Sequence, residues 1–405
     1  MLTIHINKNA TGLVRYFTNS LSKDDYFFSG KSIPGRWHGI LAQSLGLSEK
    51  VSQKDFNNLA HNRHPHTGKK LTIRNAAERR TSIEYTFSAP KSVSLVMALS
   101  PDGKEILNAH RRAVRKAMQA IEMDMQTQTR INGRKTYART GNIVYARFDH
   151  FTSRPVKEVQ NDLVRFTSDP NLHSHCVVFN CTQYRGRYQA IEGSSIHRVA
   201  GYYEAIYHSQ LSKALQKLGY EILRTKDRWE VRSPGLTRAT LENFSRRTIE
   251  IEKLAKKLGI VDPKKKAALG AKTRLNKSKT HDHVDLKRVW RNRLTAIELK
   301  AIQAAKGHLR PPVHILTPQK AIDRALAHHL ERQSAVPVKK LLGYALSLSY
   351  GSLTLNDVQK ELYARSNILT AQRGHLHYLT TKEMVRAEDR MIEFASLGKG
   401  TVKPI

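Results

Sequence analysis

Two stretches of sequence decide the fold, GNIVYARFDHF at 141–151 and LHSHCVVFNCTQY at 172–184. Their composition predicts strands, in which side chains two residues apart point to the same face of a sheet. That period places His173 and His175 on one face of the second stretch. The residues between the two stretches can form a long hairpin connection. We therefore expect a strand pair that brings His150 together with the other two histidines.

Three converging histidines have two interpretations. Neutral imidazole is a common ligand of divalent metals, and a His-x-His strand presents two nitrogens at adjacent positions on one face. A third histidine from the partner strand completes a triad that keeps positions open for phosphate oxygens, as catalytic metal sites do. However, 19 histidines in 405 residues make chance pairs common. Spacing alone leaves ordinary strand histidines as the alternative.

The charge balance predicts a polyanionic partner. The chain has 69 Lys plus Arg against 34 Asp plus Glu, a formal net charge of +35. Its basic residues are spread along the chain and not gathered beside an amphipathic segment, which favours nucleic acid over a membrane surface. Charge by itself carries little sequence information, because it acts through phosphate neutralisation.

The sequence also predicts the cellular compartment. No stretch approaches the roughly 20 apolar residues that cross a bilayer, and the N-terminus lacks a signal-peptide pattern, so we expect a cytoplasmic protein without membrane insertion. Cys176 and Cys181 are the two cysteines, and their spacing matches no zinc motif. We interpret both as small buried hydrophobic residues.

Periodicity outlines the remaining elements. We expect a strand at 2–7, then a helix that carries Tyr16. A strand that ends at Phe87 should be followed, after Pro90, by a helix to Leu99. Longer helices are expected at 37–60, 103–130, 195–218 and 319–395.

Length predicts two or three domains, because single cores seldom exceed about 250 to 300 residues. We expect a first domain at 1–306, a proline-bearing linker at 307–318 and a helical extension at 319–405.

Tyr16 and Tyr26 are candidate nucleophiles, although composition does not single them out among 15 tyrosines. A phenol with a pKa near 10 needs a nearby cation, metal or base to react at neutral pH.

A series of motifs carries a resemblance to a known family. In order, these are MLTIHINKNATGLVRYF, DDYFFSGKSIPGRWHGILAQSLGLSEKV, YTFSAPKSVSL, TGNIVYARFDHFTSR and DPNLHSHCVVFNCTQ. Together they closely resemble the relaxase domain of MobF-type conjugative relaxases, the TrwC/TraI family, from residue 1 to about residue 300. TFSAPKSVS and the DPxLHxH block lie at the family's distances from an N-terminal tyrosine pair.

The resemblance implies a fold and an activity. The fold is α+β, with a central antiparallel β-sheet (the HUH palm) packed by helices, helical fingers over DNA and a helical C-terminal extension. The activity is that of an HUH endonuclease, which nicks one strand at the nic site of a plasmid transfer origin. A tyrosine nucleophile leaves a 5′-phosphotyrosine intermediate, and the strand is later rejoined.

The resemblance also assigns roles to single residues. His150, His173 and His175 would hold a divalent metal, with Mg²⁺ or Mn²⁺ ahead of Zn²⁺, Ni²⁺ or Co²⁺. Tyr16 would be the nucleophile and Tyr26 the second tyrosine, used when the strand is recut and rejoined.

Three departures from the family pattern stand out. Phe17 and Phe27 replace the second tyrosine that the family often has at each site, which leaves one hydroxyl at each. Glu84 occupies the position of the usual aspartate beside the nucleophile, so that role is in doubt. The connection before His173 has additional residues in VKEVQNDLVRF, which we expect to extend a surface loop without displacing the triad.

Lys91 and Arg154 lie inside matched motifs as candidate DNA-binding residues, with ordinary solvated charges as the alternative. HNRHPH at 61–66 is interpreted as a solvated basic loop.

The partners implied are single-stranded and duplex DNA of the transfer origin, relaxosome accessory proteins and a type IV secretion coupling protein. We expect a monomer in the donor cytoplasm that travels with DNA to the recipient. The region after 318 resembles the start of the helicase part of full-length relaxases, but the chain contains no Walker A sequence. Two alternatives remain: a rolling-circle replication initiator and a non-catalytic DNA-binding module.

Overall fold

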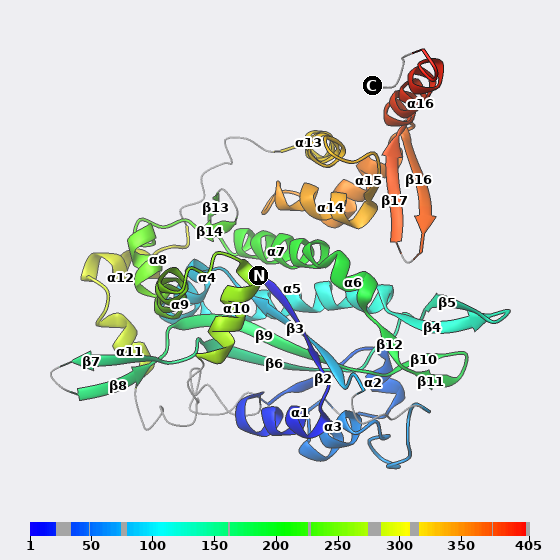
Figure 1. Ribbon diagram of the computed structural model, residues 1–405. Helices are drawn as coiled ribbons and strands as arrows, with labels where there is room; N and C mark the ends of the chain where they lie inside the picture. The colour runs from blue at the N-terminus through cyan, green and yellow to red at the C-terminus, as the bar shows by residue number, and fades with distance from the viewer. Residues whose placement is uncertain are drawn as a thin grey trace. The chain divides into compact units, whose positions relative to one another are not determined.

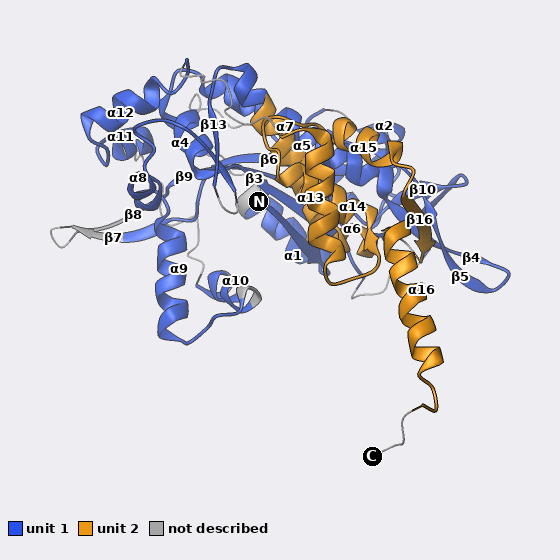
Figure 2. Cartoon of the chain, turned by 90° about the horizontal axis from the view of Figure 1, so that it is seen from above, with its two compact units in different colours: residues 1–192, 214–311 blue, residues 193–213, 312–405 orange. Residues whose placement is uncertain are grey.

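The structure is a computed structural model that describes residues 1–21, 34–47, 49–73, 79–160, 163–225, 228–273, 285–307, 316–374 and 376–401. It divides into two compact units (Figure 2), one of Met1–Glu192 with Ala214–Pro311 and one of Gly193–Lys213 with Pro312–Ile405. The domain boundaries expected at 306 and 318 stay a prediction, because residues 308–315 of the linker lie outside the described residues.

A five-stranded antiparallel sheet forms the centre of the first unit (Figure 1). Its order is β1 (Leu2–Asn7), β3 (Ser82–Ser88), β9 (Pro170–Phe179), β6 (Tyr145–Thr152) and β2 (Arg36–His38). The two strands that decide the fold, β6 and β9, are antiparallel neighbours, as predicted. β9 is the central strand of the sheet, with β3 on one side and β6 on the other.

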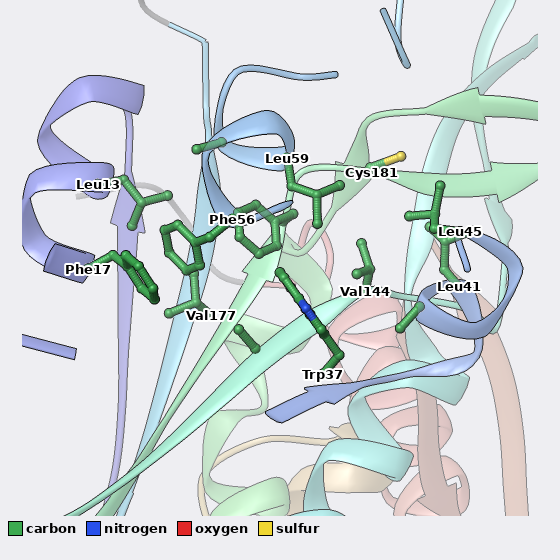
Figure 3. Close-up of a cluster of buried hydrophobic side chains, with 14 of the residues drawn as sticks. Leu13, Phe17, Trp37, Leu41, Leu45, Phe56, Leu59, Val144, Val177 and Cys181 are labelled. Atoms are coloured by element: carbon green, nitrogen blue, oxygen red, sulfur yellow. The ribbon is translucent and has the colours of Figure 1, made fainter. Parts of the chain in front are cut away.

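One face of the sheet packs against α1 (Ala10–Tyr16) and α3 (Gln53–Ala60) through a hydrophobic cluster (Figure 3). Phe17, directly after α1, stacks on Phe56 with ring centroids 4.3 Å apart. The Asn9 side chain caps α1 by accepting a hydrogen bond from the Gly12 amide at 2.9 Å. These contacts place the C-terminal end of α1 on this face of the sheet.

The opposite face is covered by α4 (Lys91–Leu99) and α5 (Gly103–Asp124), as Figure 1 shows for α5. α4 follows β3 after Pro90, and every one of its residues from Ser92 onward is buried. α5 buries the apolar stripe expected from its sequence, which includes Ile106, Ala109, Ala113, Ala117 and Ile121.

The helix expected over 37–60 was wrong in part. The structure has β2 there, then α2 (Ile40–Ser44) and finally α3. Gly39 separates the first two with φ 96°, and a Cβ at this position would lie 2.1 Å from the carbonyl oxygen of Ile143. Only glycine fits such a turn and such a close approach.

The helix expected over 103–130 ends six residues early. β4 (Gln126–Ile131) follows it and pairs with β5 (Arg134–Arg139). Asn132 and Gly133 both have positive φ, the geometry of a tight hairpin turn between twisted strands. The alternating Thr127, Thr129 and Ile131 suit a strand better than a helix.

Several smaller elements complete the first unit. The connection between β6 and β9, expected to be a long hairpin connection whose additional residues extend a surface loop, contains a hairpin of β7 (Val156–Gln160) and β8 (Leu163–Thr167). This hairpin projects away from the sheet in Figure 1. The others are β10 (Thr182–Tyr184), β11 (Arg187–Gln189), β12 (Ile191–Glu192), β13 (Ile222–Arg224), β14 (Trp229–Val231), α8 (Arg238–Asn243), α9 (Arg246–Lys257), α10 (Pro263–Lys272), α11 (Leu286–Arg291) and α12 (Ala296–Gln303).

The second unit begins with α6 (Ser194–Arg198) and most of α7 (Ala200–Lys217). Its C-terminal part is mostly helical, as expected, with α13 (Pro318–Leu330), α14 (Val338–Ser347), α15 (Leu355–Ala364) and α16 (Lys382–Leu397). It also contains a three-stranded sheet of β15 (Val336–Pro337), β17 (Leu376–Thr381) and β16 (Ile368–Arg373) that the sequence did not predict. Among the described residues, no helix has the length and apolarity to cross a membrane.

Candidate active site

The three predicted histidines meet on the sheet face that α1 covers. His150 on β6 lies directly opposite His173 on β9, and His175 follows two residues later on the same face. One side-chain ligand atom from each lies within 4.8 Å of the other two. The ring centroids are 4.9 to 5.4 Å apart. The predicted convergence of the triad is therefore present in the structure.

Hydrogen bonds orient two of the imidazoles. Nδ1 of His175 lies 2.5 Å from Oε1 of Glu84, and Nδ1 of His173 lies 2.8 Å from the carbonyl oxygen of Asn171. A carboxylate and a carbonyl only accept, so both rings donate through Nδ1–H and keep the Nε2 lone pair. Three neutral imidazoles at this separation fit a divalent metal with open coordination positions.

Glu84 is the acidic residue at the centre of the site. It lies on β3 with 5% of its surface exposed, and Oγ1 of Thr86 donates to its Oε1 at 3.3 Å. Burial raises its pKa, but the hydrogen bond from His175, with smaller contributions from His5 and Thr86, outweighs burial and lowers it. The side chain is therefore an ionised acceptor at neutral pH.

Tyr16 ends α1 beside this carboxylate. Its hydroxyl donates to Oε1 of Glu84 at 3.4 Å, and its ring packs edge-on against His175 with centroids 6.4 Å apart. Phe17 turns into the hydrophobic cluster instead, with 5% of its surface exposed. The single hydroxyl at this pair of positions therefore faces the triad.

The other predicted site residues have different surroundings. Tyr26 lies outside the described residues, so its role stays a prediction. Nζ of Lys91 donates to the carbonyl oxygen of Pro170 at 2.7 Å, and burial lowers the pKa of Lys91 to about 8, against the raising effect of Asp169 and Glu230. Arg154 lies just beyond β6 and is half-buried. Phosphate contacts by these two basic residues also stay predictions.

Sequence reasoning missed two neutral residues of the site, Thr86 and Asn171. Oγ1 of Thr86 lies 3.1 Å from Nδ1 of His175, directly across from it in the sheet. Asn171 supplies the carbonyl that orients His173. A period-two reading would have found both, because Thr86 shares a face with Glu84, and Asn171 with His173.

Cys176 and Cys181 are buried free thiols, as expected, and burial raises the pKa of both. In the HNRHPH segment, Nε2 of His66 lies 2.9 Å from the carbonyl oxygen of Gly46.

Comparison with known proteins places this geometry in a family. A family model described as TrwC relaxase matches residues 10–297. The chain belongs to the TrwC relaxase family. It is thus a MobF-type conjugative relaxase domain with an α+β fold, as the sequence motifs indicated.

Curated relatives support the same membership. The chain is 29% identical over 359 residues to the multifunctional conjugation protein TraI of Escherichia coli strain K12, covering 82% of this chain and 19% of that protein. It is 30% identical over 299 residues to a second Escherichia coli TraI, covering 70% of this chain and 15% of the relative. The chain therefore spans less than a fifth of the length of these relatives.

Solved structures of the relaxase TrwC share the fold. One in complex with oriT DNA, in a metal-free state, has a TM-score of 0.60 and 29% identity, covering 74% of this chain and 99% of that chain. A copper-bound complex with oriT DNA has a TM-score of 0.61 and 30% identity over the same shares. Another complex holds a 27-mer DNA comprising the recognition hairpin and the cleavage site, with a TM-score of 0.59, 28% identity, and 74% and 99% coverage.

Proposed function

We propose that this relaxase domain nicks one strand of DNA at the nic site of a plasmid transfer origin, with Tyr16 as the nucleophile. One observation carries the proposal. The hydroxyl of Tyr16 and Nδ1 of His175 both contact Oε1 of Glu84, so the candidate nucleophile and the histidine triad belong to one hydrogen-bonded group. Support comes from TrwC, whose solved structures contain oriT DNA.

Tyr16 would perform the bond-forming step. Its phenol oxygen attacks the scissile phosphorus, the bond to the 3′ oxygen breaks, and a 5′-phosphotyrosine with a free 3′-hydroxyl results. Glu84 lies close enough to take the phenol proton, directly or through a water molecule, and the departing 3′ oxygen gains a proton. Covalent capture retains the phosphodiester energy, so rejoining the strand needs no ATP.

His150, His173 and His175 would hold a divalent metal, which supplies Lewis-acid polarisation of a phosphate oxygen. Mg²⁺ and Mn²⁺ are the proposed ions, with Zn²⁺, Ni²⁺ and Co²⁺ as alternatives. Glu84 and Asn171 keep two of the imidazoles turned so that Nε2 is available.

Further parts of the proposal concern the strand and its partners. Tyr26 would act as the second nucleophile when the transferred strand is recut and rejoined. Lys91 and Arg154 would contribute positive charge near the phosphates. Single-stranded and duplex DNA of the transfer origin, relaxosome accessory proteins and a type IV coupling protein are the proposed partners, in the donor cytoplasm.

Labelled oligonucleotides that span candidate transfer origins test the proposal. Incubated with Mg²⁺ or Mn²⁺, the protein should yield a nicked strand and a covalent adduct, and a chelator should abolish both. Tyr16→Phe should lose the adduct, while the matched Tyr137→Phe on β5 should retain it. An adduct that persists at the wild-type level in Tyr16→Phe would overturn the assignment.

A further inference from the structure

A buried polar network lies directly behind the triad. Asp149 precedes His150 on β6, and Ser174 lies between His173 and His175 on β9, so strand alternation turns both side chains to the opposite face of the sheet. Asp149 is 8% exposed and Ser174 fully buried. The two are direct cross-strand partners, and Oγ of Ser174 donates to Oδ1 of Asp149 at 2.6 Å.

α5 and β6 complete this network. Nε of Arg111 donates to Oδ2 of Asp149 at 2.7 Å, and Nε of Arg147 lies 3.4 Å from Oδ1. Nε2 of His110 lies 2.9 Å from Oγ of Ser174. Because the serine hydrogen is directed at Asp149, the serine oxygen accepts from His110. A buried carboxylate is costly unless it is paired and hydrogen-bonded, and here it is both.

The position of this network matters for the register of the strands. The Asp149–Ser174 pair is flanked by the His150–His173 pair on one side and the Phe148–His175 pair on the other. Beyond His150 the register shifts, so that Thr152 pairs with Pro170. A slip of one residue would turn every side chain of a strand to the other face. The triad therefore lies where the regular pairing of β6 and β9 ends, so contacts that fix the register there also fix the histidines.

We infer that Asp149 is a positioning residue for the triad. Held by Ser174, Arg111 and Arg147, it fixes β6 against β9 and against α5 at the level of the three histidines. Directional hydrogen bonds select one register, whereas apolar side chains would tolerate several. The inference rests on the proposed function only in treating the triad as a metal site.

A purely structural role makes a different prediction. If Asp149 contributed only to global stability, a variant measured well below its Tm would bind metal as tightly as the wild type. If it positions the triad, the folded variant binds metal more weakly, because the ligand nitrogens no longer hold one arrangement. Metal affinity in the folded state therefore separates the two roles.

Mn²⁺ titration calorimetry on the full chain tests the inference without DNA. Asp149→Asn and Ser174→Ala should each weaken Mn²⁺ binding by roughly tenfold, the lower end of the loss seen when a direct partner of a metal ligand is removed, because neither side chain contacts a triad imidazole itself. Ser174→Thr keeps the hydroxyl and should bind Mn²⁺ with the affinity of the wild type. Glu122→Gln is the matched control. The Glu122 carboxylate accepts hydrogen bonds from the amides of Ile40 and Ile143 and lies outside the network. Its substitution should therefore lower the free energy of unfolding without weakening Mn²⁺ binding.

Wild-type Mn²⁺ affinity in folded Asp149→Asn would overturn the inference, and so would an equal affinity loss in Glu122→Gln. If Asp149→Asn does not fold, Ser174→Ala decides by the same criterion. A wild-type chain that binds no Mn²⁺ also overturns it. Normal Mn²⁺ binding without any nicking would instead reject the proposed function and leave the inference standing.

Discussion

The carboxylate of Glu84 lies 2.5 Å from Nδ1 of His175, although 91 positions separate the two residues. The sheet register explains the contact, because Thr86 is directly opposite His175 and Glu84 lies two residues further along the same face. The longer side chain of glutamate spans this diagonal. The substitution of glutamate for the family's usual aspartate therefore keeps a carboxylate on His175, one of the three proposed metal ligands.

Glu84→Gln should weaken Mn²⁺ binding by roughly tenfold to a hundredfold, because a neutral amide makes the imidazole of His175 a poorer ligand. Titration calorimetry measures the affinity directly. Glu84→Asp tests whether a shorter side chain still reaches His175. It keeps the charge but loses one methylene, so its Mn²⁺ affinity should lie between those of the wild type and Glu84→Gln. Unchanged affinity in Glu84→Gln would remove this residue from the site.

His173→Ala should abolish measurable Mn²⁺ binding at the triad, because two imidazoles cannot replace the three-nitrogen donor set. His197→Ala, at an exposed histidine on α6, is the control and should bind as the wild type does. Equal Mn²⁺ affinity in the two variants would show that the triad is not where the ion binds.

Phe17→Ala should lower the free energy of unfolding by about 3 to 5 kcal/mol, the usual cost of deleting a buried aromatic ring. The ring stacks on Phe56 inside the hydrophobic cluster, so its loss leaves a cavity beneath the end of α1. Urea unfolding measures this cost. Phe17→Leu refills part of the space and should lose less. A loss below about 1 kcal/mol in Phe17→Ala would contradict the packing of this ring against Phe56.

Lys91 should make stability depend on pH in an alkaline window. Burial lowers its pKa from 10.5 to about 8, so between these values the folded chain binds fewer protons than the unfolded chain. The contribution of Lys91 to stability therefore rises with pH across that window. From the lower to the upper end of this pH window, the free energy of unfolding of the wild type should rise by about 3 kcal/mol relative to that of Lys91→Met.

Urea unfolding of the wild type and Lys91→Met at several pH values across the window measures this gain. The exposed Lys104→Met on α5 is the control, and its difference from the wild type should stay constant. A constant difference in Lys91→Met as well would show that the pKa of Lys91 is not lowered in the folded chain.

The sequence predicted the parts of the site that depend on local periodicity. His173 and His175 share a face because strand side chains alternate, and β6 and β9 pair as the hairpin connection between them predicted. The family motifs then brought Tyr16 into the same site. Each of these inferences needed only neighbouring residues or an ordered set of motifs.

Features that depend on contacts between residues far apart in the sequence were not predicted. The break after β2 depends on the close approach of Gly39 to the carbonyl of Ile143, more than 100 residues away. The network around Asp149 was missed because a strand aspartate is usually solvent-facing, whereas here Arg111 of α5 and Ser174 of β9 hold it in the interior. Such tertiary contacts leave no periodic signal in the chain.

Mapping the covalent adduct shows which tyrosine is the nucleophile. Trypsin should release Tyr16 in YFTNSLSK at 16–23 and Tyr26 in DDYFFSGK at 24–31, so each peptide contains one candidate tyrosine. After the first cleavage of a nic oligonucleotide, mass spectrometry should find the nucleotide on the 16–23 peptide. A nucleotide found on the 24–31 peptide, or on neither, would contradict the account.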